Sequence, residues 1–173
     1  MALDSLHDLL LEQLRDLHSA ETQLVKALPK LVEKITTPTL REAVNAHYGE
    51  TQGHVTRLDR IFNGLAEKAT GEKCKGMEGL IDECDDVAGE HGSDYVRDAG
   101  IIASAQRVEH YEIAAYGCAI SFARLLGHQD IVTLLEETLA EEKAADEKLN
   151  AIAEEEVNQQ ALAGATTTAH GKY

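Results

Sequence analysis

The sequence has few of the residues that interrupt helices or that stabilise small secreted proteins. Its 173 residues contain two prolines, no tryptophan and only 4% aromatic residues, whereas Ala, Leu and Glu, which favour helices, are abundant. The three cysteines are odd in number and have no CxxC spacing, so we expect free thiols in a reducing cytoplasm and neither a disulfide framework nor a zinc site. No apolar run is long enough to span a bilayer, so no membrane partner is expected.

Positive charge is also scarce in this chain. Asp and Glu number 31 against 16 Lys and Arg, which gives a formal net charge of −15. Because such a surface repels a polyanion, the charge balance argues against a nucleic-acid partner. The hydrophobic fraction of 43% is ordinary for a globular protein, and the length suffices for one domain with a sizeable core.

Four long segments carry apolar residues at steps of three and four, which is the period of an amphipathic helix. They cover residues 5–34, 40–63, 94–126 and 129–157, and a shorter helix is predicted over residues 77–90. The shorter helix lies in the long connection between the second and third long segments. Helices of similar length with one long connection predict an all-α protein in which the helices pack as a bundle.

Two boundaries follow from local composition. Thr39 is the predicted N-cap of the second long helix, since its hydroxyl can accept a hydrogen bond from a backbone N–H in the first turn. Residues 159–173 are small and polar, so we expect a flexible C-terminal tail after a single domain over residues 1–158.

The long helices place acidic or imidazole side chains where their apolar lines should continue. A carboxylate is almost never buried unless it is paired, because an isolated buried one costs several kcal/mol or takes up a proton. A shared metal cation removes this difficulty, since it supplies the counter-charge and uses the oxygen lone pairs as ligands. The inward positions are Glu21 in the first helix, His47 and His54 in the second with Glu50 beside them, Glu109 and Glu112 in the third, and Glu142 in the fourth.

A single acid on a helix usually lies on the solvated face, but the set favours a metal site, because side chains three or four residues apart share a helix face. Two alternatives stay open. Rotation of the last helix would replace Glu142 by Glu141, and His47 either binds metal or packs in the core with a hydrogen bond to a neighbour. The pairs with this spacing are Glu109 with Glu112, Glu50 with His54, and Glu142 with Asp146.

Several stretches resemble the YciE/YciF family of the ferritin-like superfamily. The most specific is AQRVEHYEIAAYG (105–117), and HYGETQGHVTRLDRIF (47–62) and LLEETLAEEKAADEKL (134–149) add to it. The resemblance extends over residues 5–155. It implies a ferritin-like antiparallel four-helix bundle with a long crossover and a short additional helix. It also implies a cytoplasmic homodimer linked to bacterial stress responses, in a family whose biochemical activity is not well defined.

Ferritin-like di-metal sites take one Glu from each of two helices and a Glu-xx-His pair from each of the other two. This chain departs from that pattern, because its second helix has ExxxH spacing and its fourth offers Asp146 where His is usual. A site rich in carboxylate suits iron or manganese better than zinc or copper. The metal ligands that the resemblance implies are Glu21, Glu50, His54, Glu109, Glu112, Glu142 and Asp146.

We therefore expect a di-metal carboxylate protein that binds two iron or manganese ions in the bundle core and reacts with O2 or peroxide in a stress response. As an enzyme it would be a ferroxidase- or peroxidase-like di-iron oxidoreductase. The alternative is a metal-free dimeric bundle with a structural or interaction role, whose inward acids are protonated or hydrogen-bonded to His and Lys. Metal analysis separates the two.

Overall fold

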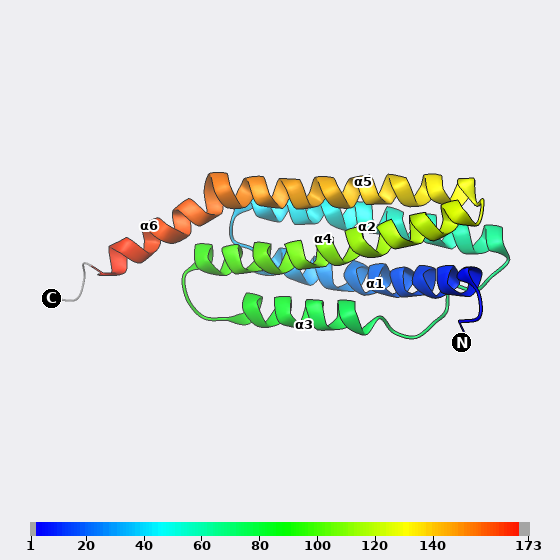
Figure 1. Ribbon diagram of the computed structural model, residues 1–173. Coiled ribbons are helices and arrows are strands. Elements are labelled where there is room, and N and C mark those ends of the chain that lie inside the picture. The colour runs from blue at the N-terminus through cyan, green and yellow to red at the C-terminus, as the bar shows by residue number, and fades with distance from the viewer. Residues whose placement is uncertain (1–2, 170–173) are drawn as a thin grey trace.

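Four long helices form the bundle that the sequence predicts, and a shorter helix lies outside it (Figure 1). The computed structural model describes residues 3–169, with side chains through residue 164. Within these residues there is no β-strand, and no helix combines the length and the apolar character needed to cross a membrane. The bundle helices are α1 (Leu6–Lys34), α2 (Pro38–Leu65), α4 (Asp94–Leu125) and α5 (Gln129–Ile152).

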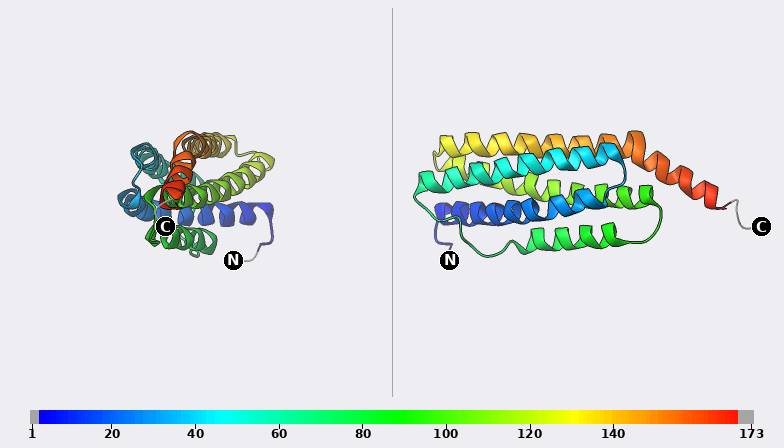
Figure 2. Two further views of the ribbon diagram at one scale, coloured as in Figure 1. Left: turned by 90° about the vertical axis from the view of Figure 1, so that its left-hand side faces the viewer. Right: turned by 180° about the vertical axis from the view of Figure 1, so that it is seen from behind.

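The bundle consists of two helical hairpins joined by a long crossover. Each long helix packs against two others, in the order α1, α2, α5, α4 around the bundle. The crossover returns along the length of the bundle, so that neighbouring helices run antiparallel (Figures 1 and 2). It contains α3 (Lys75–Gly89), which packs on α1 and α4. The predicted long crossover with a short additional helix is therefore confirmed.

The core is divided into two apolar clusters with polar side chains between them. Leu14 and Leu17 of α1 belong to one cluster, and Leu24 and Leu28 belong to the other. Glu21 lies between these pairs on the same face of α1 and is fully buried. Burial of each Leu contributes about 1.5–3 kcal/mol. Both ends of the bundle are thus held by apolar packing, and the middle is left for polar side chains.

The start of α2 differs from the sequence prediction. Thr37 is the N-cap in place of Thr39, because Pro38 occupies the first helical position, where the missing N–H of proline has no cost. The Thr37 side chain makes no capping hydrogen bond. Instead, the buried carboxylate of Asp98 on α4 accepts a hydrogen bond of 2.7 Å from the Thr37 backbone N–H. A contact between distant helices therefore supplies the cap, which local sequence does not reveal.

The C-terminal segment is helical where the sequence predicts a flexible tail. A π-helical turn, η1 (Ala153–Val157), continues α5, and α6 (Asn158–Ala169) follows it and turns away from the bundle axis (Figure 2). Turns of this kind often accompany bends in long helices. Alanines in the segment favour the helical state. The remainder of the predicted tail, residues 170–173, lies outside the described residues.

Candidate metal centre

The side chains that interrupt the apolar faces meet in the middle of the bundle, between the two apolar clusters. All of them are buried, although each carries a carboxylate or an imidazole. They come from all four bundle helices, so the helical packing alone brings them together. The six side chains are Glu21 of α1, His47 and His54 of α2, Glu109 and Glu112 of α4, and Glu142 of α5.

One group of potential ligands is centred on His54. Its Nδ1 lies 2.9 Å from Glu142 Oε1 and 3.3 Å from Glu21 Oε1. The three ligand atoms of this group all lie within 4.8 Å of one another. Nδ1 has no partner with hydrogen-bond geometry despite these short distances. Three potential ligand atoms therefore converge on one point, an arrangement that a bound cation would fit.

A second group contains His47, Glu109, Glu112 and again Glu142, with its ligand atoms within the same 4.8 Å limit. His47 Nε2 lies 3.5 Å from Glu109 Oε1 and 3.8 Å from Glu142 Oε2. Glu142 thus directs Oε1 towards His54 and Oε2 towards His47. A carboxylate that presents one oxygen to each of two donor groups has the geometry of a bridging ligand.

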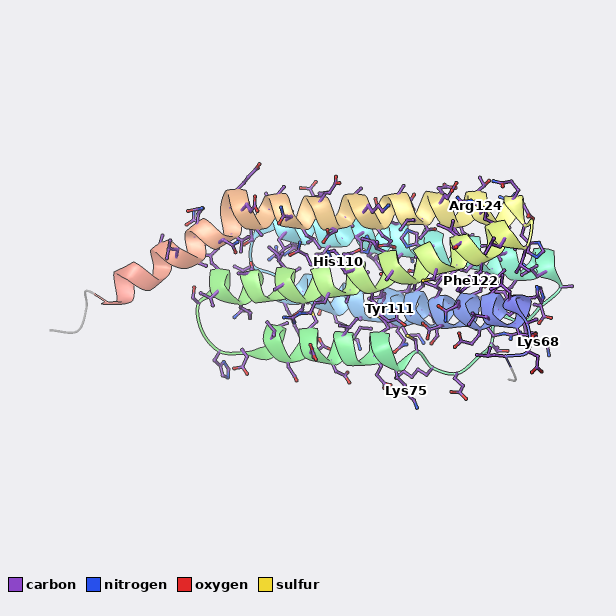
Figure 3. The ribbon with its side chains drawn as sticks, in the orientation of Figure 1. Lys68, Lys75, His110, Tyr111, Phe122 and Arg124 are labelled. Atoms are coloured by element: carbon purple, nitrogen blue, oxygen red, sulfur yellow. The ribbon has the colours of Figure 1, made fainter. Side chains whose placement is uncertain are left out.

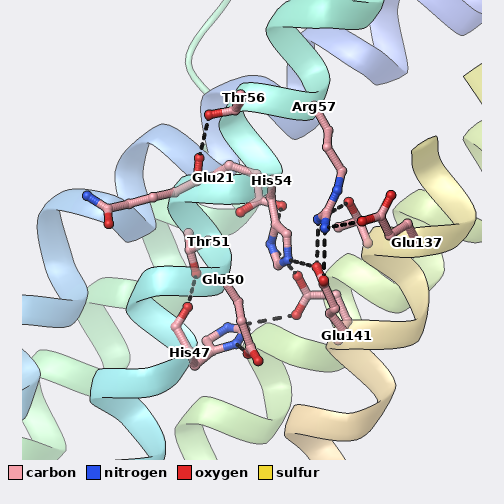
Figure 4. A network of polar contacts seen from close by, with 12 residues as sticks. Glu21, His47, Glu50, Thr51, His54, Thr56, Arg57, Glu137 and Glu141 are labelled. Atoms are coloured by element: carbon pink, nitrogen blue, oxygen red, sulfur yellow. Dashed lines mark hydrogen bonds and ion pairs between the residues drawn. The ribbon is translucent and has the colours of Figure 1, made fainter.

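The outer nitrogen of His54 has a partner of its own (Figure 4). His54 Nε2 lies 2.9 Å from Glu141 Oε2. Arg57 donates to both oxygens of Glu141, at 2.6 and 2.8 Å. Partial burial opposes ionisation of Glu141, but the bonds from Arg57 outweigh it and lower the pKa of this carboxyl. An ionised carboxylate on the outer nitrogen fixes the imidazole so that Nδ1 faces the centre, as is usual for metal-binding histidines.

His47 has a similar arrangement with a weaker outer partner. Its Nδ1 lies 3.3 Å from Glu50 Oε2, while Nε2 faces the centre. The Glu50 side chain is 46% exposed. The two histidines of α2 thus approach the centre from adjacent positions, each with a carboxylate behind it, but only His54 has that carboxylate clamped by an arginine.

Tyr116 reaches the centre from the apolar cluster that contains Leu14 and Leu17. It is fully buried, and its hydroxyl donates a hydrogen bond of 2.5 Å to Glu21 Oε1. This contact holds one oxygen of Glu21 and leaves Oε2 without a partner. The tyrosine is therefore part of the support of the centre.

Many of the ligand atoms are unsatisfied. Among the described residues, seven buried N and O atoms of the centre have no hydrogen-bond partner. Each such atom costs about 1–3 kcal/mol, so the cluster has to be satisfied either by protons shared among its groups or by a bound cation. The atoms are Glu21 Oε2, His54 Nδ1, Glu109 Oε2, both oxygens of Glu112 and both oxygens of Glu142.

The protonation of the centre reflects this crowding. Burial, reinforced by the neighbouring carboxylates, raises the pKa of Glu109 and of Glu112 well above the usual range. Burial acts to lower the pKa of His54, but Glu142 and Glu21 outweigh it and raise this pKa to about 10. Without a cation the centre therefore retains protons at neutral pH. A divalent cation would replace these protons and would use the same oxygen and nitrogen atoms.

The donor set fits a metal ion of the iron or manganese type. It consists of four buried carboxylates and two buried imidazoles in the middle of the bundle, with an outer carboxylate on each imidazole. Oxygen donors with a few nitrogen donors suit these metals, whereas zinc and copper sites are richer in nitrogen or sulfur.

Two residues that the sequence suggested as ligands lie outside the two groups. Glu50 is the outer partner of His47, as described above. Asp146 is half-buried on α5, where Oδ1 accepts a hydrogen bond of 3.2 Å from Gln106 and Oδ2 lies 3.4 Å from Nε2 of the exposed His110 (Figure 3). The side chain of Asp146 is thus engaged by α4 on the flank of the bundle. The other five suggested ligands are brought together.

The structure shows where the side chains lie in both cases that the sequence left open, namely Glu141 against Glu142 and the position of His47. Glu142 is fully buried and faces the centre, whereas Glu141 lies beside it as the partner of His54 and Arg57. His47 lies among the acids as a member of the second group. Its signal in the sequence is its distance of seven residues from His54, since two helical turns return a side chain to the same face.

Comparisons with known proteins agree with this architecture. Residues 5–162 match the family described as a domain of unknown function, DUF892. Protein YciF of Escherichia coli is 42% identical over 162 residues, covering 93% of this chain and 98% of that protein. The crystal structure of this E. coli stress protein has a TM-score of 0.86 and covers 90% of this chain and 98% of that chain.

Two further solved structures are similar to this chain. A putative structural protein from Rhodopseudomonas palustris is 48% identical with a TM-score of 0.84, covering 87% of this chain and 96% of that chain. A ferritin-like diiron-carboxylate protein of Bacillus anthracis shares 17% identity with a TM-score of 0.66, covering 88% of this chain and 99% of that chain, and this likeness concerns the fold alone. The chain therefore belongs to the DUF892 family, is similar to E. coli YciF over most of its length, and has a ferritin-like fold.

Proposed function

We propose that this protein binds two iron or manganese ions in the bundle core and uses them to reduce O2 or peroxide in a stress response. The observation that carries the proposal is Glu142, a fully buried carboxylate that belongs to both groups of potential ligands. A lone buried carboxylate of this kind is costly, whereas a bridge between two cations would give each of its two oxygens a positively charged partner.

The two groups divide the ligands between the two ions. One ion would be held by Glu21, His54 and Glu142. The other would be held by His47, Glu109 and Glu112, with Glu142 shared. On this proposal Glu50 and Glu141 act on the histidines from outside, and Tyr116 keeps Glu21 in place.

When bound, two Fe(II) or Mn(II) ions supply two electrons, which reduce O2 to H2O2, or H2O2 to two water molecules, with the uptake of two protons. The protein residues determine where this happens. Glu141 and Arg57 orient His54, and the two apolar clusters exclude bulk water from both ends of the centre.

The test is metal content and metal-dependent stability. Protein purified without chelators, or titrated anaerobically with Fe(II) or Mn(II), should contain about two ions per chain. Its melting temperature should rise with free metal, because a ligand that binds only the folded state stabilises it by mass action. Glu142→Gln should lose both ions and this rise. Glu147→Gln, at an exposed position of the same helix, should retain them.

The second candidate is a metal-free structural or interaction bundle, and the description of the R. palustris relative as a putative structural protein favours it. Protein that takes up no metal from anaerobic Fe(II) and keeps the same melting temperature would support this candidate. For the first candidate, the stress response follows the description of the E. coli relative as a stress protein. A homodimer in the cytoplasm is part of the same proposal, and light scattering measures its oligomeric state.

A further inference from the structure

An apolar cavity of about 110 Å³ lies next to the His47 half of the centre. Residues of all four bundle helices line it, and it is open on one side. Leu28 and Leu31 line it from α1, Val44 from α2 and Leu149 from α5, and its inner end is formed by His47 and Glu109. Lys148 and the half-exposed Glu50 stand at its outer end. The cavity therefore connects the rim of the bundle with one of the potential metal ligands.

A second cavity, of about 40 Å³, reaches the same two side chains from the side of α3. Leu28, Leu31 and Ala105 line both cavities, and so do His47 and Glu109. Unfilled space in a protein core is destabilising, by about 24 cal/mol for each Å³. Both spaces end on the same pair of potential ligands, where a reactant would have to arrive.

The inner end of the space also has an unpaired polar group. Glu109 is 3% exposed, and its Oε2 has no hydrogen-bond partner among the described residues. A molecule that occupied the cavity would contact this carboxylate and the imidazole of His47. Its remaining contacts would be almost entirely with aliphatic side chains.

We propose that this cavity admits and holds dioxygen, and that dioxygen, and not hydrogen peroxide, is the oxidant that reaches the centre through it. The inference rests on the proposed function and names its substrate. An apolar cavity of this order of size binds small apolar molecules such as xenon. Hydrogen peroxide could donate one hydrogen bond, to Glu109 Oε2 at the inner end. Along the aliphatic walls it would have to give up its other hydrogen bonds to water, and an unpaired hydroxyl costs about 2–7 kcal/mol in apolar surroundings.

Xenon binding tests the cavity without any need for metal. Crystals of the protein under xenon pressure should show xenon between Leu31 and Ala105. The xenon should be absent from Ala105→Leu, whose longer side chain fills the space. Ala103→Leu, an exposed position of the same helix, should retain it. Wild-type crystals without xenon at this place would overturn the proposal.

Stopped-flow oxidation of the Fe(II)-loaded protein tests the oxidant. In Ala105→Leu the rate with O2 should fall by about tenfold, while the rate with H2O2 and the affinity for Fe(II) stay unchanged. Ala144→Phe, at an exposed position that lines the outer end of the cavity, should act in the same way if Ala105→Leu does not fold. An equal loss with both oxidants, or no loss with O2, would overturn the proposal.

The two experiments keep this inference separate from the proposed function. Xenon binding in a protein that takes up no metal would show that the cavity exists and that the proposed function fails. If the protein binds two ions but no xenon, and if Ala105→Leu does not change the rate of oxidation by O2, the proposed function stands. The cavity is then rejected as the entrance for O2.

Discussion

The His54 half of the centre is held more firmly than the His47 half. The outer carboxylate of His54 is Glu141, which Arg57 binds through both oxygens. The outer carboxylate of His47 is Glu50, whose side chain is 46% exposed. Glu50 Oε2 lies 3.3 Å from His47 Nδ1, whereas Glu141 Oε2 lies 2.9 Å from His54 Nε2. His54 is fully buried, whereas His47 lies at the end of both cavities.

This difference in the outer partners indicates that the two histidines have different roles in the centre. A rigid imidazole fixed by a clamped carboxylate is suited to hold an ion permanently. An imidazole with a half-exposed partner and free space beside it can shift when a reactant arrives. We expect the ion at His54 to bind more tightly than the ion at His47, and we expect reactants to approach from the His47 side.

The largest expected effect is the loss of an inward imidazole. His54→Ala should weaken binding of the tighter ion by more than the roughly 10–100-fold that loss of an outer partner costs. His47→Ala should leave that tighter ion in place and remove only the weaker one. Anaerobic titration calorimetry with Fe(II) or Mn(II) resolves the two steps, and His91→Ala outside the bundle is the control. Equal effects on both steps from either substitution would contradict the division into two unequal halves.

Loss of an outer partner should have a smaller and unequal effect. Arg57→Ala frees Glu141 and should weaken the tighter ion by about 10–100-fold. Glu50→Ala should weaken the other ion by less than about tenfold, because interactions of half-exposed charges are screened by water. The same titrations measure both values. If Glu50→Ala proved the more harmful, the His47 half would be the firmer one.

The metal-free protein should lose stability as the pH rises from mildly acidic values. The pKa of Glu109 and of Glu112 is raised from 4.5, so their contribution to stability is full below that pH and is lost as the pH rises through the folded-state values. The pKa of His54 is raised from 6.5 to about 10, so its contribution is lost between these two pH values. Thermal melts of chelated protein from pH 5 to pH 9 should show a falling melting temperature, by about 2–4 °C for each kcal/mol lost.

Substitutions assign each part of this pH dependence to one half of the centre. Glu112→Gln should flatten the curve at acidic to neutral pH, and His54→Ala should flatten it above pH 6.5, the ordinary histidine value. The lowered pKa values of Glu50 and Glu141 act in the opposite direction, since those groups stabilise the fold above their unfolded-state pKa of 4.5. Their contribution is nearly constant above about pH 5, so a melting temperature that rises steadily from there towards neutrality would contradict the raised pKa values of Glu109 and Glu112.

Helical periodicity predicts the bundle and most of the centre, because both depend on which face of a helix a residue occupies. Glu21 and Glu142 stand in gaps of regular apolar lines, and both are buried. Tertiary contacts decide what periodicity leaves open. The cap of α2 comes from Asp98 on another helix, and no local pattern indicates it.

Glu50 and Asp146 show the limit of spacing arguments. Each is four residues from a residue of the centre, and four residues correspond to a rotation of about 40° beyond a full turn. For Glu50 and Asp146 this offset moves the side chain from the centre to its flank, where a neighbouring polar group engages it. For His47 and Glu141, spacing in the sequence does not decide whether the side chain faces the centre. Only the rotation of α2 and α5 about their own axes in the bundle decides this.

The smallest expected effect concerns the segment most distant from either half. α6 extends beyond the bundle and contributes no side chain to the two ligand groups formed by the described residues. Deletion of residues 159–173 should therefore leave metal content, both binding constants and the xenon site unchanged, because Val157 and the rest of η1, which pack on α4 and α5, are retained. Titration of the truncated chain beside the full chain measures this. A selective loss of the ion at His47 would show that the C-terminal helix helps to close the open half of the centre.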